Sequence, residues 1–101
     1  MSKLSPTQRT LKEMRERGYT CFIVEYWHHW SKQRRDLFGF VDILCLKEDE
    51  VLGVQATSMS HVSERVKKIA DHENVGAVRK AGIRILVQGW DGAKLREVDC
   101  S

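Results

Sequence analysis

The sequence predicts a single α/β domain of the mixed α+β kind, with a central mixed sheet of four to five strands flanked by helices. Three observations predict it. A capped helix opens the chain, three strand-like runs follow it, and an amphipathic helix then leads into a further apolar strand. The order of elements is therefore αβββαβ. At 101 residues the chain has the size of one domain, and we expect that domain to span residues 1–101.

Composition and charge exclude several classes of protein. The chain is 42% hydrophobic and 31% charged, which is typical of a globular domain and not of a disordered one. It has no apolar run of about 18 residues and no apolar segment near its start, so we expect a cytoplasmic protein with no membrane span and no secretory signal. Cys21 and Cys45 lie in apolar runs and form no CxxC pair, which favours reduced core residues. The net charge of +3 permits a nucleic-acid partner.

The first helix has clear start and stop signals. Ser5 suits the N-cap and Pro6 the first helical position, while Gly18 suits the residue just after the end, so the helix should run to about Arg17. Residues 20–27 are rich in β-branched and aromatic side chains and predict the first strand.

Residues 28–35, HHWSKQRR, predict a loop. The two adjacent histidines have no cysteine or histidine at zinc-ligand spacing, so a zinc site is not expected. Trp30 beside Arg34 and Arg35 instead favours a surface that stacks on bases and contacts phosphates. The alternative is an ordinary solvated basic face.

The central prediction is a hairpin made by strands at residues 37–46 and 51–57. If its turn has two or four residues and no bulge, Leu46 pairs with Val51. The same register places Asp42 directly across from Gln55.

The remaining segments complete the expected sheet. Ser58 is the expected N-cap of a second helix, in which apolar residues recur at spacings of three and four. Arg65 and Lys68 lie on the helix face opposite these apolar residues. They are either functional basic residues or part of an ordinary solvated face. The later segments are expected to be a short helix at 73–81, a strand at 83–87 reached by a parallel crossover, a turn at 88–92 and an edge strand at 94–98.

Asp42 is the residue whose type fits its strand least well. A carboxylate inside an apolar strand is costly unless it is paired, hydrogen-bonded or bound to a cation. The Asp42 carboxylate, the side-chain oxygen of Gln55 and the main-chain carbonyl of Ala56 would suit Mg²⁺ or Mn²⁺, since hard cations prefer oxygen ligands. Alternatively, Asp42 and Gln55 hydrogen-bond each other and the neighbouring backbone.

These residues resemble a known pattern. Val41-Asp42, followed by Gln55-Ala56-Thr57, is similar to the active-site motif of the PD-(D/E)XK nuclease superfamily. The chain also resembles small phage and bacterial proteins described as nuclease-like or Holliday-junction-resolvase-like. The resemblance implies a restriction-endonuclease-like core, dependence on Mg²⁺ or Mn²⁺, and hydrolysis of DNA phosphodiesters.

Carried over position by position, the resemblance makes Asp42 the metal-binding aspartate and puts Gln55 in place of the second acid. Thr57 stands where the motif has lysine, and it cannot supply a positive charge. Lys68 or Arg65 could take over that role from the following helix. A further acid could complete the site, and the sequence leaves open Glu13, Glu25 and Asp36. An extended strand would hold Asp36 about 20 Å from Asp42, so Asp36 can join only if the chain bends.

Three functions follow as hypotheses. The first is a metal-dependent DNA endonuclease or resolvase, homodimeric and acting on DNA that includes branched forms. The second is a catalytically weak or inactive nucleic-acid-binding module on the same fold. The third is a protein-interaction or inhibitory factor. In the first two, phosphates are contacted by the basic residues Arg34, Arg35, Arg65 and Lys68.

Overall fold

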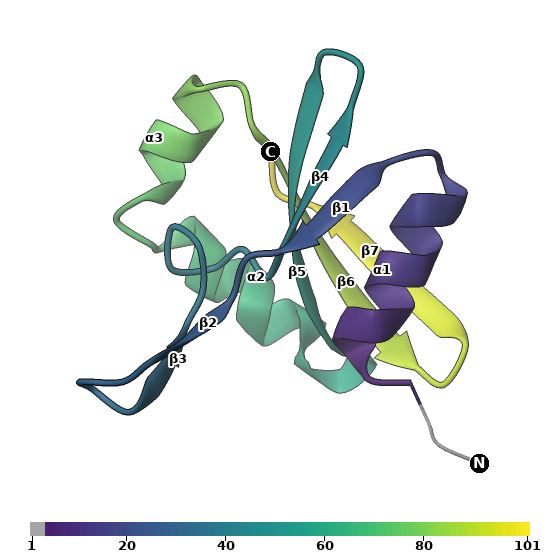
Figure 1. Cartoon of the computed structure of the whole chain (residues 1–101), viewed down its shortest axis with the longest axis horizontal. Coiled ribbons are helices and arrows are strands. Elements are labelled where there is room, and N and C mark those ends of the chain that lie inside the picture. The colour runs from purple at the N-terminus through teal and green to yellow at the C-terminus, as the bar shows by residue number, and fades with distance from the viewer. Residues whose placement is uncertain (1–3) are drawn as a thin grey trace.

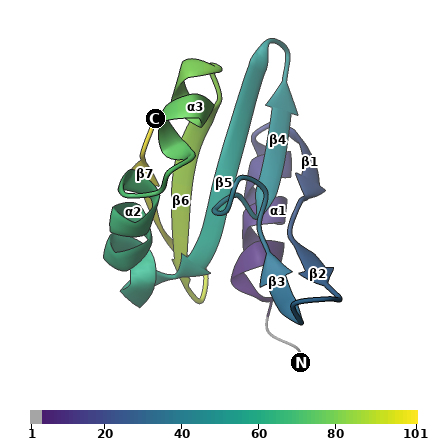
Figure 2. The same ribbon diagram turned by 90° about the vertical axis from the view of Figure 1, so that its left-hand side faces the viewer.

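The computed structural model describes residues 4–101 as a five-stranded mixed sheet with helices on both faces (Figures 1 and 2). The strands lie in the order β1-β4-β5-β6-β7, and β2 pairs with β3 in a separate two-stranded ribbon. Only the β5–β6 pair is parallel within the sheet. The mixed α+β class and the five-stranded sheet are thus confirmed. The elements are α1 Pro6–Glu16, β1 Thr20–Ile23, β2 Tyr26–His28, β3 Gln33–Arg35, β4 Ile43–Lys47, β5 Glu50–Ser58, the 3-10 turn η1 Met59–His61, α2 Val62–Ala70, α3 Val75–Lys80, β6 Arg84–Asp91 and β7 Lys94–Asp99.

Helix α1 begins as its sequence predicts. The Ser5 hydroxyl accepts the Gln8 amide N–H, and the Gln8 side chain accepts the Ser5 N–H, so two otherwise unpaired donors are satisfied. The helix ends at Glu16, and Gly18 follows with a φ of +96°. Leu11 and Met14 are buried and attach α1 to one face of the sheet.

The predicted hairpin forms with the expected register. Leu46 pairs with Val51, and Lys47 with Glu50, around a two-residue turn. The strand expected at residues 37–46 is correct only in its second part, because β4 begins at Ile43. Residues 37–41 form a tight loop instead.

The ribbon was not expected from the sequence. Residues 20–27 do not form one strand, since β1 stops at Ile23 and the chain leaves the sheet near Glu25. Residues 28–35, predicted to be a loop, return as β3, which pairs with β2. The resulting β2–β3 ribbon, residues 26–35, extends away from the main sheet (Figure 1). The prediction failed because strand propensity does not reveal which partner a strand pairs with.

The second half of the chain supplies the parallel crossover. The chain passes from β5 through η1, α2 and α3 to β6, which lies parallel to β5 as expected. The turn predicted at 88–92 is wrong, because β6 continues to Asp91. Gln88 is buried in that strand and donates to Glu97 at 2.8 Å, while Gly89 leaves space for Val62 of α2. Ser58 ends β5 and is the N-cap of η1, without a side-chain capping bond, whereas the N-cap of α2 is His61.

Two hydrophobic clusters lie on opposite faces of the sheet. One contains Met14 of α1 together with the buried and free thiols of Cys21 and Cys45. The other joins Phe40 and Val41 of the 37–41 loop to α2 and α3. Within residues 4–101, no helix is both long enough and apolar enough to cross a membrane.

Candidate metal centre

Three acidic side chains converge where the ribbon meets the sheet. Glu25, Asp36 and Asp42 each offer a carboxylate oxygen, and these oxygens all lie within 4.8 Å of one another. Asp42 is buried and the other two are partly buried. The sequence left open which acid would join Asp42, and the structure brings both Glu25 and Asp36 to it.

Asp36 reaches the cluster because the chain reverses in five residues. Leu37 and Val41 exchange two backbone hydrogen bonds of 3.0 and 2.9 Å, which closes the loop and places the flanking residues side by side. The reversal depends on positive φ angles of +59° at Phe38 and +92° at Gly39. Glycine adopts this conformation readily, whereas phenylalanine does so at a cost.

Glu25 is positioned by the end of β1. Ile23 pairs with Ile43, and the N–H of Val24 donates to the carbonyl of Asp42 at 2.8 Å. Glu25 therefore follows the last backbone contact between β1 and the segment that carries Asp42. Its odd position in the sequence, an acid in an apolar strand, is explained by this place at the edge of the site.

Asp42 sits just before β4 and has few polar partners. One of its carboxylate oxygens accepts the backbone N–H of Ala56 at 3.0 Å. Burial, the charge of Asp36, a hydrogen bond with the Asp36 side chain and the charge of Glu25 together raise the pKa of Asp42 to about 8, while the Ala56 N–H opposes the shift. A carboxylate has about four acceptor positions, so this single N–H leaves room for a cation.

Gln55 supplies the second polar feature. Its side chain is only 3% exposed, and its Oε1 has no hydrogen-bond partner among residues 4–101. Gln55 lines the same hollow as the three acids, together with Ala56. The expected direct pairing of Asp42 with Gln55 is not part of the ladder, which ends at the Ile43–Val54 pair. The two residues nevertheless border one hollow.

This donor set fits a divalent cation. An orphaned buried oxygen and three carboxylates are all hard ligands, which suit Mg²⁺ or Mn²⁺. Oxygens on one octahedral Mg²⁺ lie about 3 Å apart when adjacent and about 4 Å apart when opposite, so the three acids would draw closer together to share a single ion. The contact made by Ala56 is through its N–H, which holds Asp42 in place.

Two arginines border the acids. Arg34 of β3 donates to Glu25 at 3.1 Å, although its own side chain is 69% exposed. Arg65 of α2 lines the hollow, and its buried Nε has no partner among residues 4–101. Thr7, in the first turn of α1, also lines the hollow, and no sequence signal singled it out.

Other candidates lie outside the hollow. Thr57 is buried but does not line it, and Lys68 and Arg35 are exposed and do not line it either. Glu13 is paired with Arg17 at 2.8 Å, and Arg17 in turn contacts Glu97 of β7 at 2.9 Å. Glu13 therefore belongs to a network that ties α1 to the sheet.

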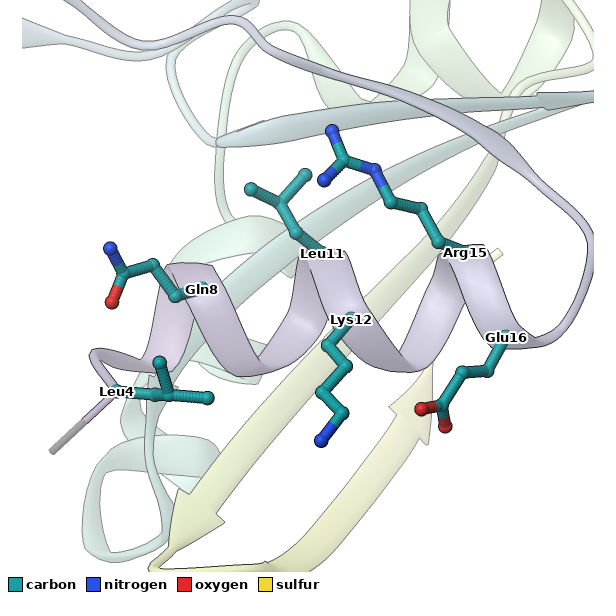
Figure 3. Close-up of a pocket in the computed structure, with 6 residues that line it drawn as sticks. All are labelled: Leu4, Gln8, Leu11, Lys12, Arg15 and Glu16. Carbon is teal, nitrogen blue, oxygen red and sulfur yellow. The ribbon is translucent and has the colours of Figure 1, made fainter.

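A wider hollow on the outer side of α1 does not compete as a site. Its side chains fan out in different directions, and Glu16 is the one acid among them (Figure 3). Its lining residues are Leu4, Gln8, Leu11, Lys12, Arg15 and Glu16.

The candidate metal centre is thus assembled from six places in the chain: the start of α1, the two ends of the ribbon, the entry to β4, the middle of β5 and the first turn of α2. Such a site combines oxygen ligands for a cation with arginines for an anion. Comparison with protein-family models, with curated proteins and with solved structures finds no match to this chain.

Proposed function

We propose that this protein is a metal-dependent DNA endonuclease or resolvase-like phosphodiester hydrolase with a PD-(D/E)XK, restriction-endonuclease-like core. The observation that carries the proposal is the meeting of Glu25, Asp36 and Asp42 with the unpartnered oxygen of Gln55 in one hollow. Acids held so close together cannot all be charged unless a cation neutralises them, and the raised pKa of Asp42 expresses this repulsion. The same hollow holds Arg65, a partner suited to phosphate.

Each residue has a definable task in this proposal. Asp42, Asp36 and Glu25 would hold Mg²⁺ or Mn²⁺, with Gln55 as a neutral oxygen ligand. The bound cation would supply activation of a water molecule and neutralisation of charge on the phosphate. Arg65 would hold the phosphate and stabilise the charge that develops on it, the role that Thr57 cannot perform.

Arg34 would also take part in binding the substrate. Its guanidinium forms an ion pair with Glu25 at an N–O distance of 3.1 Å. A cation at the acids would release Arg34 to contact an incoming phosphate. Arg35 and Lys68, which are exposed, would add longer-range attraction for DNA.

Plasmid and branched DNA incubated with the protein in Mg²⁺ or Mn²⁺ test the proposal. We expect cleavage by the wild type and none by Asp42→Asn. Asp49→Asn is the matched control, since Asp49 is an exposed acid in the β4–β5 turn, and this variant should cut normally. Cleavage that persists unchanged in Asp42→Asn would refute the proposed site.

Two further variants test which basic side chain, Arg65 or Lys68, stabilises the charge on the phosphate. Arg65→Ala should lower the cleavage rate by about 100-fold, the usual effect of losing one group that stabilises transition-state charge. Lys68→Ala should change it by less than about tenfold, because Lys68 contributes only exposed charge. A larger loss of cleavage rate in Lys68→Ala than in Arg65→Ala would show that Lys68 stabilises the charge on the phosphate.

The inactive DNA-binding module remains the second candidate. It is favoured by the absence of a lysine among the residues that line the hollow. It predicts DNA binding that weakens steeply with salt and no cleavage under any divalent cation.

A further inference from the structure

The β2–β3 ribbon carries an aromatic and basic surface beside the metal centre. Among its exposed side chains, Trp30 is 94% exposed, Tyr26 is 56% exposed and Trp27 is 54% exposed. Residues 26–35 also contain Lys32, Arg34 and Arg35, and no acid. Lys32 and Arg35 form no ion pair within residues 4–101.

We propose that this ribbon stacks Trp30 on an unpaired DNA base, so that the substrate of the candidate metal centre is DNA with a single-stranded flap. The inference rests on the proposed DNA nuclease function and names its substrate class. Aromatic faces beside cations suit single-stranded DNA, because the rings stack on bases while the cations contact the backbone.

The tip of the ribbon is built to hold Trp30 outward. The ring of His28 accepts the Ser31 N–H at 3.2 Å and lies 2.8 Å from the Ser31 hydroxyl, so the turn is closed from within. Lys32 completes the turn with a φ of +52°. Trp30 is therefore presented on an ordered turn, and stacking on it would cost little conformational entropy.

The base of the ribbon ends at the metal centre. Tyr26 pairs with Arg35, and the adjoining residues, Glu25 and Asp36, are two of the three clustered acids. Trp30 lies four positions beyond Tyr26 along the chain, a span of at most about 13 Å even if fully extended. Successive nucleotides along one strand of DNA are spaced about 3.4 Å apart, so the cut should fall within about four nucleotides of the stacked base.

Charge favours DNA over a second copy of the chain as the occupant. The ribbon carries three basic residues and no acid, and Lys32 and Arg35 stay free of ion pairs within residues 4–101 while Arg34 contacts Glu25, so the surface attracts phosphates and repels its own duplicate. A dimer contact through the ribbon is therefore the competing outcome of the test.

Binding is measured by fluorescence anisotropy in EDTA at low salt, with a labelled duplex that carries a flap of unpaired thymines and a fully paired duplex with the same number of phosphates. The wild type should bind the flapped DNA about tenfold more tightly, the size of one stacking contact. Trp30→Ala and Trp30→Leu should lose this preference, and Trp30→Phe, which keeps an aromatic face, should retain most of it. Leu46→Ala is the control, since Leu46 is an exposed apolar residue of β4 outside the ribbon.

Equal affinity of the wild type for the two DNAs would overturn the inference, and so would a full preference in Trp30→Leu. Loss of self-association in Trp30→Ala, seen by sedimentation velocity, would assign the ribbon to a dimer contact instead. Because the binding assay contains no metal, its result does not depend on cleavage. Failure of the nuclease proposal would appear as an intact flap preference without any cutting.

Discussion

The unpartnered side-chain oxygen of Gln55 distinguishes the candidate metal centre from an ordinary buried polar cluster. A buried side-chain oxygen without a partner costs about 1–3 kcal/mol, so a residue kept for stability alone would be hydrogen-bonded. Binding a cation would satisfy this oxygen and offset that cost. Gln55 thus stands where stability and the proposed function make opposite demands.

Replacing Gln55 tests that opposition. Gln55→Met keeps the volume and removes the unpartnered oxygen, so the free energy of unfolding should stay the same or rise by up to about 1 kcal/mol. The affinity for Mn²⁺ should fall about tenfold or more, by analogy with the loss of other metal-site partners. Urea unfolding and isothermal titration calorimetry measure the two effects. A less stable variant with unchanged Mn²⁺ affinity would make Gln55 a structural residue.

Asp42 gives the centre a pH dependence. The pKa of Asp42 in the folded protein is raised to about 8 from the ordinary value of 3.8. The folded state therefore keeps a proton that the unfolded state loses, and without metal the stability should fall as pH rises from about 4 to about 8. Asp42→Asn cannot lose this proton, so at pH 8 in EDTA its melting temperature should exceed that of the wild type by at least about 4 °C.

Thermal unfolding across this pH range measures the effect, with Asp49→Asn as the control that should follow the wild type. Saturating Mn²⁺ should raise the melting temperature of the wild type at pH 8 and leave that of Asp42→Asn almost unchanged. Parallel pH profiles for the wild type and Asp42→Asn would show that Asp42 is not the protonated group.

At the scale of elements, the 37–41 loop delivers Asp36 to the metal centre. Gly39, at its middle, has a φ of +92°, and a Cβ there would collide with the ring of His72. The loop thus depends on a residue that no side chain can replace without movement.

Gly39→Ala should therefore weaken both stability and Mn²⁺ binding. Gly82→Ala is the matched control, because Gly82 has a φ of +83° and open space where its Cβ would lie. The control should lose about 1–2 kcal/mol of stability from backbone strain and keep its Mn²⁺ affinity. Gly39→Ala should lose more stability and bind Mn²⁺ more weakly, as followed by calorimetry. Equal Mn²⁺ affinity in the two variants would separate the loop from the site.

The hairpin and the loop differ in how far sequence could predict them. The register of β4 and β5 followed from alternating side chains and a short turn, which together leave little freedom. The reversal at Phe38 and Gly39 did not follow, because a positive φ at phenylalanine is not visible in a sequence. One signal was present, since Asp36 and Asp42 are equally spaced about Gly39 and would meet if the chain folded back there.

Arg65 and Lys68 illustrate the same limit. They lie three residues apart on one stripe of α2, and their spacing alone makes them equivalent. Only the packing of α2 against the sheet turns Arg65 into the hollow and leaves Lys68 exposed. The sequence could therefore predict that this helix supplies a basic side chain to the site. Only the tertiary structure shows that this side chain is Arg65 and not Lys68.

For the whole molecule, the two edges of the sheet differ in a way that bears on assembly. The β7 edge carries exposed charges such as Lys94 and Arg96, which discourage pairing with another sheet. The β1 edge instead exposes Phe22 and Ile23, at 54% and 53%. An uncovered apolar edge strand favours pairing with a second copy of the chain.

We accordingly expect a homodimer formed through β1. Ile23→Lys should give a monomer, because a charge at this edge opposes strand pairing, while Leu4→Lys, at an exposed apolar position outside the sheet, should remain dimeric. Sedimentation velocity distinguishes the two states. A wild type that sediments as a monomer at every concentration tested would contradict the expected homodimer.

We propose that Glu25, Asp36 and Asp42 hold one divalent cation. Crystals of the whole protein grown with Mn²⁺ and measured at a wavelength where manganese scatters anomalously test it most directly. We predict a single anomalous peak within about 2.0–2.4 Å of oxygens from all three acids, with Gln55 Oε1 turned toward it. A saturating Mn²⁺ concentration that leaves no peak between these carboxylates, or places it elsewhere on the protein, would contradict the claim.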